Sequence, residues 1–156
     1  MTKNLNNIEI AELLRDVAAA YQLQSEVKNK FKIIAYQRAA DAIEHASSEL
    51  KDIWDENKLD DVPGIGSSIA SHLSDLFKSG KSKHFDDLLA PLPKAMFKLM
   101  QVPGIGPKRA YRLSTEFKLN EKNAIQDLKK IAIQGKISNL EGFGPDSQGL
   151  KLIKKS

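Results

Sequence analysis

The pentapeptide Val62-Pro63-Gly64-Ile65-Gly66 recurs later in the chain as Val102-Pro103-Gly104-Ile105-Gly106. A weaker third copy reads Leu140-Glu141-Gly142-Phe143-Gly144. The first glycines of the three copies are separated by 40 and then 38 residues, so the chain contains an internal repeat. The repeated stretch therefore decides how the fold is built.

Each copy of the pentapeptide joins two segments of helical pattern. Glycine adopts the positive φ angles that a tight turn requires, and the isoleucine between the two glycines is placed to enter the core. Pro107, directly after the second copy, suits the first position of a helix. The repeat therefore predicts helical hairpins, each with a short glycine turn.

The rest of the chain also carries helical periodicity. Asn6 followed by Glu9 indicates a capping box before an apolar pattern from Ile10 to Tyr21. A longer pattern runs from Val27 through Phe31 and Ile34 to Leu50. Shorter helices are expected around Ile69–Phe77, His84–Leu89, Pro93–Met100, Arg109–Phe117 and Ala124–Ile133. No alternating strand pattern is found, so we predict an all-α fold.

The segment Ala90-Pro91-Leu92-Pro93 interrupts the helical pattern and marks a predicted domain boundary. We expect two small helical subdomains, a first at 1–90 and a second at 91–156. Residues 1–93 hold 11 basic and 15 acidic residues, a net charge of −4. Residues 94–156 hold 13 basic and 5 acidic residues, a net charge of +8. The total of +4 therefore conceals a basic second half, which favours an anionic partner.

Composition excludes several classes of function. The 156 residues include no cysteine, so disulfides, thiolate catalysis and cysteine-based zinc or iron–sulfur sites are ruled out. The two histidines that invite a metal interpretation, His72 and His84, lack a third ligand at zinc spacing. No apolar run approaches the roughly 18 residues of a membrane helix, and no signal segment is found, so we expect no membrane partner.

The glycine hairpins indicate an anion site. A helix that starts directly after a glycine turn directs backbone N–H groups outward, and no side chain separates them from a ligand. In a basic helical protein without cysteine, the natural anion is a backbone phosphate.

The hairpins resemble the helix-hairpin-helix motif of DNA-binding proteins that do not read sequence. The block Phe31–Ala40 (FKIIAYQRAA), followed by VPGIGSSIASHLSDLFKSGK, resembles the amino-terminal region of family X DNA polymerases. The resemblance covers nearly the whole chain and implies a lyase-type domain followed by a fingers-like subdomain. In that family a palm domain with catalytic aspartates comes next. We therefore expect a piece of such a polymerase, partnered by its own palm domain, or a stand-alone relative, and no polymerase activity from this chain alone.

The resemblance places the main phosphate clamp in the second hairpin, at Gly104, Ile105, Gly106, Lys108 and Arg109, with Arg112 one turn further on. Gly64 and Gly66 correspond to it in the first hairpin. The family also implies a monovalent cation, potassium or sodium, held by main-chain carbonyls. These carbonyls belong to Met100, Val102 and Ile105, and in the first hairpin to Asp60, Val62 and Ile65. No zinc and no organic cofactor is expected. In the third copy, Glu141 and Asp146 repel phosphate, so that segment is expected to pack.

In the first module the family uses a lysine that forms a Schiff base with a 5′-deoxyribose phosphate. The matching position is His72, and neighbouring phosphate-binding lysines are replaced by Ser68 and His84. Imidazole forms no such Schiff base, so we predict no efficient lyase activity. Lys32 and Tyr36 do match the family, lie four residues apart, and are expected to hold a 5′-phosphate or stack on a base, or else to be a solvated lysine and a packing tyrosine.

Three functions remain open at this point. The first is sequence-independent binding of gapped or nicked DNA through backbone phosphates, within base excision repair. The second is a 5′-deoxyribose phosphate lyase that uses Lys78, Lys81 or Lys83, and the third is a protein-interaction module. The expected location is the cytoplasm, at the nucleoid, in a prokaryote, or the nucleus in a eukaryote.

Overall fold

A computed structural model describes residues 5–137, and every regular element within that range is a helix. The all-α prediction is therefore confirmed. The chain divides into two compact units, which we call unit 1 (Met1–Pro91) and unit 2 (Leu92–Ser156). Within residues 5–137, no helix combines the length and the apolar character that crossing a membrane demands.

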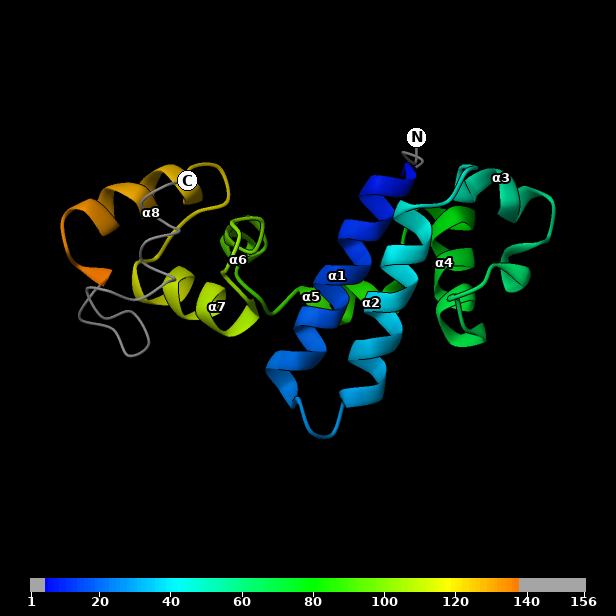
Figure 1. Ribbon diagram of the computed structural model, residues 1–156, viewed down its shortest axis with the longest axis horizontal. Coiled ribbons are helices and arrows are strands. Elements are labelled where there is room, and N and C mark those ends of the chain that lie inside the picture. Colours follow the sequence, from blue (N-terminus) through cyan, green and yellow to red (C-terminus); the bar gives the residue numbers. More distant parts are fainter. Residues whose placement is uncertain (1–4, 138–156) are drawn as a thin grey trace. The chain divides into compact units, whose positions relative to one another are not determined.

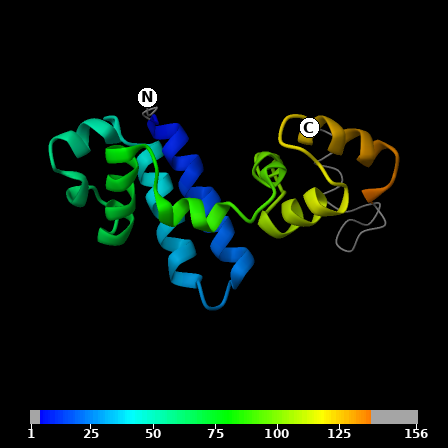
Figure 2. The same ribbon diagram turned by 180° about the vertical axis from the view of Figure 1, so that it is seen from behind.

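Unit 1 is built around two long antiparallel helices, α1 (Asn7–Gln24) and α2 (Lys30–Glu44), which lie side by side in Figures 1 and 2. The predicted capping box begins α1, because the Asn6 side chain accepts from the Glu9 N–H at 2.8 Å and the Glu9 carboxylate accepts from the Asn6 N–H at 3.2 Å. The run Val17–Tyr21 is buried at five successive positions, so this end of α1 is enclosed on all sides. Alanines on both helices allow their backbones to approach closely.

The predicted helical pattern from Val27 to Leu50 is wrong as a single element. α2 ends at Glu44, and a separate short helix, α3 (Leu50–Asp55), begins after a non-helical connection. Asn7 stabilises this break: its Nδ2 donates to the Ser48 carbonyl at 2.8 Å, and its Oδ1 accepts from the Leu50 N–H at 2.7 Å. One side chain from α1 thus pairs backbone groups that a continuous helix would have paired internally.

The same pattern also misplaces the buried face of α2. Val27 and Phe31 are 88% and 85% exposed, whereas the helix buries Ile33, Tyr36, Ala39, Ala40 and Ile43. Val27 lies before the first residue of α2, so its spacing from the later apolar residues does not follow one helical repeat.

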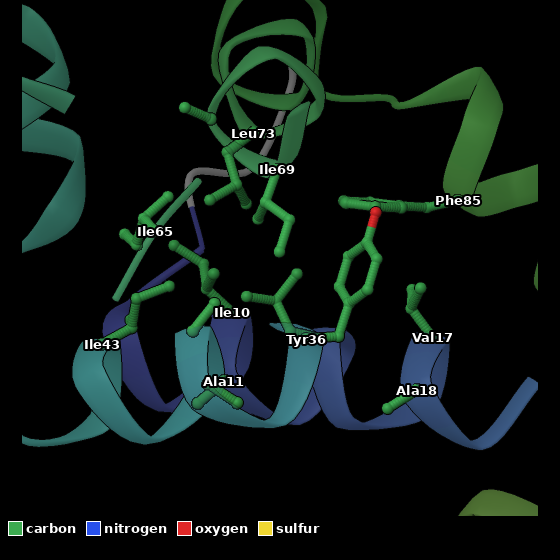
Figure 3. Packing of buried hydrophobic residues seen from close by; sticks show 14 of the residues in the cluster. Ile10, Ala11, Val17, Ala18, Tyr36, Ile43, Ile65, Ile69, Leu73 and Phe85 are labelled. Atoms are coloured by element: carbon green, nitrogen blue, oxygen red, sulfur yellow. The ribbon is translucent and has the colours of Figure 1, made fainter. Parts of the chain in front are cut away.

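The remaining elements of unit 1 cover the α1–α2 pair. They are a 3₁₀ turn η1 (Leu59–Asp61), α4 (Ser67–Ser79) and α5 (Lys83–Leu89). Figure 3 shows Ile65, Ile69 and Leu73 directed toward Ile10 and Ile43, with Tyr36 reaching up to Phe85. Ile65, the residue between the two glycines, is 6% exposed, so the first hairpin is anchored in this core.

Unit 2 repeats the hairpin on a smaller scale. It contains α6 (Lys94–Leu99), α7 (Pro107–Glu116) and α8 (Ala124–Ile133). Its core includes Met96, Leu99, Leu113 and Leu128, all at most 1% exposed, and Ile105 between the second pair of glycines is 4% exposed. The third copy, at 140–144, lies outside the described residues.

The geometry of the first hairpin predicts that alanine substitutions at its two glycines differ in their effect on stability. Gly64 has φ +93°, and a Cβ there would lie 3.0 Å from Ala42 Cβ, whereas Gly66 is extended with open space around it. We expect Gly64→Ala to lower the free energy of unfolding of unit 1 by about 1–3 kcal/mol. The matched control, Gly66→Ala, should cost less, about 0.5–1 kcal/mol, because alanine is a poorer N-cap residue than glycine but meets no neighbouring atom there. Urea unfolding followed by fluorescence of Trp54, the single tryptophan, reports on unit 1. Equal loss in both variants would contradict the assigned turn geometry.

Candidate nucleic-acid interface

The second hairpin is a tight turn that ends at the first residue of a helix. The Ile105 N–H donates to the Val102 carbonyl at 3.1 Å, and Gly104 has φ +87°. The first bond inside α7 runs from the Ala110 N–H to the Gly106 carbonyl at 2.9 Å. The N–H groups of Gly104 and Gly106 precede that bond and belong to exposed residues. This places backbone donors at the positive end of a ten-residue helix, where phosphate oxygens bind well.

Cationic side chains continue from this turn along α7. Ala110 and Leu113 are fully buried and set the inward face of the helix, which leaves Lys108 and Arg109 exposed and Arg112 half-buried. Lys108 and Arg112 are four residues apart, so they share one helix face next to the turn. The residues that the resemblance assigns to the clamp are therefore brought together by the structure. Tyr111 lies three residues after Lys108, and its side chain is 41% exposed. It was not among the contact residues predicted from the sequence, although a tyrosine between two cations can be recognised there.

The first hairpin has the same backbone and a different charge. The Ile65 N–H donates to the Val62 carbonyl at 3.2 Å, and the Ala70 N–H to the Gly66 carbonyl at 2.9 Å, as in the second hairpin. The helix that follows begins with Ser67 and Ser68 in place of the second copy's Pro107 and Lys108. Two exposed acids, Asp60 and Asp61, lie just before the turn. The first hairpin offers backbone donors without the cations of the second.

Lys32 and Tyr36 both contact Tyr21, but Lys32 is exposed and Tyr36 is buried. The Lys32 ammonium lies 5.2 Å from the centre of the Tyr21 ring and is exposed. Tyr36 is 4% exposed, and its ring packs 5.7 Å from Tyr21 and 6.0 Å from Phe85. Burial, with the Tyr21 hydroxyl nearby, raises the pKa of Tyr36 well above its usual value. Of the two residues, Lys32 is therefore the one accessible to a ligand, while Tyr36 supports the core.

His72 and His84 stack face to face, a contact that their spacing in the sequence did not predict. Their ring centres are 4.0 Å apart and their planes differ by 4°. The short connection between α4 and α5 produces this contact: Gly80 ends α4 with φ +77°, and Ser82 caps α5 by accepting from the Phe85 N–H at 3.3 Å. Phe85, 1% exposed, then anchors α5 so that His84 lies against α4.

Trp54 lies beside the first hairpin and packs against the core. Its indole N–H donates to the Ser74 hydroxyl at 3.0 Å, and its ring centre is 5.4 Å from that of Phe77. It borders a hollow of about 480 Å³ that also touches Asp60 and Asp75. These contacts give Trp54 a packing role, in an acidic part of the surface.

The fold and the turns match known domains. Residues 5–82, half of the chain, match a helix-hairpin-helix domain, and residues 56–119 and 96–147 match a SAM-like helix-hairpin-helix tandem. The chain therefore belongs to the helix-hairpin-helix family.

A particular relative points to a polymerase. The chain is 29% identical over 140 residues to the DNA polymerase/3′-5′ exonuclease PolX of Bacillus subtilis (strain 168). The match covers 90% of this chain and 23% of that protein, so the chain spans under a quarter of its relative's length. The predicted resemblance to the helix-hairpin-helix region of a family X polymerase is confirmed. Together these findings support DNA binding in a polymerase-related context.

Proposed function

We propose that the chain binds DNA through its sugar–phosphate backbone without reading sequence, as the DNA-binding region of a repair-type family X polymerase. The observation that carries this proposal is the second hairpin, where exposed glycine N–H groups, Lys108 and Arg109 adjoin the start of α7. Phosphate contacts of this kind position a protein on DNA, whereas sequence is read from base edges.

The preferred DNA in this proposal is a gapped or nicked duplex. Each hairpin presents one short backbone contact, so two hairpins grip two short stretches of phosphates. The second supplies charge through Lys108 and Arg109, and the first supplies backbone donors beside the exposed Arg38 of α2, whose side chain adjoins Gly64. Lys32, also on α2, adds an exposed cation elsewhere in unit 1. A duplex interrupted by a gap offers two such stretches with a flexible joint between them, which accommodates two units connected at 91–92.

A monovalent cation, potassium or sodium, completes the proposed phosphate contacts. Hard cations prefer oxygen ligands, and each turn holds a carbonyl, that of Val62 or Val102, which already accepts one hydrogen bond. A carbonyl oxygen has two lone pairs, so each can also face an ion. The carbonyls of Met100 and Ile105, and of Asp60 and Ile65, complete the two sets. When bound, the ion offsets charge between carbonyl and phosphate oxygens.

Lyase activity has weaker support. The imidazole of His72 stands where the family resemblance requires a primary amine, and it is stacked on His84. The alternative lysines are exposed: Lys83 pairs with Asp87 at 2.9 Å, which raises its pKa and keeps it protonated. A protonated amine is no nucleophile, so Lys83 is poorly suited to Schiff-base formation.

The clamp predicts a charge effect with a defined location. Binding of a gapped duplex should weaken as salt rises, and Lys108→Glu/Arg109→Glu should lower the slope of log affinity against log salt by about two. Lys122→Glu is a control in the same unit, since Lys122 is exposed and follows the far end of α7. Fluorescence anisotropy measures all three proteins. A salt-independent affinity, or an equal effect of Lys122→Glu for each charge reversed, would refute the clamp.

The cation proposal predicts an ion-specific affinity. Replacing potassium chloride with tetramethylammonium chloride at the same ionic strength should weaken DNA binding several-fold, because the larger ion does not fit among carbonyls. The effect should be small in the Lys108→Glu/Arg109→Glu variant, which has already lost its grip on the phosphate. Equal affinity in both salts for the wild-type chain would rule out the ion.

The absence of a suitable amine predicts no covalent adduct. Borohydride should trap no chain–DNA product on a pre-incised abasic duplex, because His72 forms no imine. A trapped band from the wild-type chain would show the prediction to be wrong. Substituting Lys78, Lys81 and Lys83 by Gln, one at a time, would then identify the nucleophile.

A further inference from the structure

The stacked histidines belong to a cluster formed by four helices. His72 comes from α4, His84 from α5, Tyr21 from α1 and Lys32 from α2. The Tyr21 hydroxyl lies 2.8 Å from His84 Nε2, and the Lys32 ammonium lies over the Tyr21 ring. Both histidines are half-buried.

The geometry of the pair does not suit a metal ion. An imidazole nitrogen directs its lone pair in the plane of the ring, and two rings that are 4.0 Å apart and 4° from parallel direct their lone pairs side by side. Among residues 5–137, no three metal-ligating side chains gather at one place. Each imidazole can instead bind and release a proton at a ring nitrogen.

When no ligand is bound, the surroundings of the cluster favour the neutral forms of His84 and of the tyrosines. Burial first, and then the neighbouring His72 and Lys32, lower the pKa of His84, while Asp87 on α5 acts in the opposite direction. Asp87 is itself paired with Lys83 at 2.9 Å. Burial raises the pKa of both Tyr21 and Tyr36, so the phenols that face the pair stay neutral. Lys32 is therefore the fixed positive charge that lies over this cluster.

We propose that the His72–His84 pair couples DNA binding by unit 1 to proton uptake, with a phosphate group of DNA as the ligand beside Lys32. This inference rests on the proposed DNA-binding function and adds its regulation. A phosphate beside Lys32 and the histidine pair stabilises the imidazolium form of His84, which burial, His72 and Lys32 otherwise disfavour. By linkage, protonation of His84 strengthens phosphate binding to the same extent.

The sign of the pH dependence follows from the two protonation states. In the free protein His84 titrates below its ordinary value of 6.5, and bound phosphate moves its pKa upward. Affinity is constant above the bound-state pKa and rises as pH falls toward the free-state pKa, by at most about tenfold per pH unit for each proton taken up. Below the free-state pKa it becomes constant again.

The test compares pH profiles of three proteins at constant ionic strength. The full chain should bind a gapped duplex at least severalfold more tightly at pH 5.5 than at pH 7.5. The variant His72→Asn/His84→Gln should lose most of that gain, and His45→Gln should keep it, because His45 lies at the end of α2 and its Nδ1 contacts the Asp41 carbonyl. Identical profiles for wild type and the double variant would overturn the proton coupling while leaving DNA binding intact.

A second measurement needs no variant and distinguishes the sources of phosphate. The pKa of His84, followed by NMR of the wild-type chain, should rise on addition of duplexes with 5′-phosphate or 5′-hydroxyl ends, or of inorganic phosphate. A rise with the 5′-phosphorylated duplex and not with the 5′-hydroxyl duplex assigns a strand end, and a rise with both assigns internal phosphates. Unchanged pKa values with all three probes would overturn the inference, whereas loss of DNA affinity in Lys108→Glu/Arg109→Glu concerns only the second hairpin.

Discussion

The fold depends on a backbone constraint that is repeated in each unit. Gly64 and Gly104 hold φ angles of +93° and +87°, which side chains rarely adopt, and they reverse the chain within one turn. The following isoleucine is buried, and the next glycine caps a helix. Because the turn is held from the inside by Ile65 or Ile105, its two glycines present bare backbone at the surface next to an exposed proline. The same constraint thus makes the hairpin stable and exposes the groups that can meet a phosphate.

The two units show how one backbone can serve different chemistry. In unit 2, cations on α7 follow the turn, and the described residues 92–137 hold ten Lys and Arg against three Asp and Glu. In unit 1, serines follow the turn and acids precede it. His72 lies further along the helix that follows this turn and stacks on His84 of α5, while Lys32 lies on α2. Charge is therefore permanent in one unit and, under our proposal, partly dependent on protons in the other.

Local patterns in the sequence predicted the helices and the turns because capping and glycine geometry act over a few residues. The Asn6–Glu9 capping box, the buried Ile65 and Ile105, and the helix at Ala124–Ile133 are examples. The break after Glu44 could not be predicted in this way, because Asn7 stabilises it from 41 and 43 residues away. The contact of His84 with Tyr21 spans 63 residues and depends on how α5 packs. The clamp residues could be predicted because they are close together in the sequence. The contact between His72 and His84 could not be predicted, because it depends on how α5 packs against α4.

The central claim is that the second hairpin contacts DNA through its own backbone, and amide NMR tests it most directly. On titration with a short gapped duplex, the amide signals of Gly104 and Gly106 should shift early and saturate with the binding curve. Gly135, another exposed glycine of unit 2 with φ +78°, lies after α8 and should shift little. Shifts spread evenly over unit 2, or none at Gly104 and Gly106 when DNA is bound, would contradict the claim.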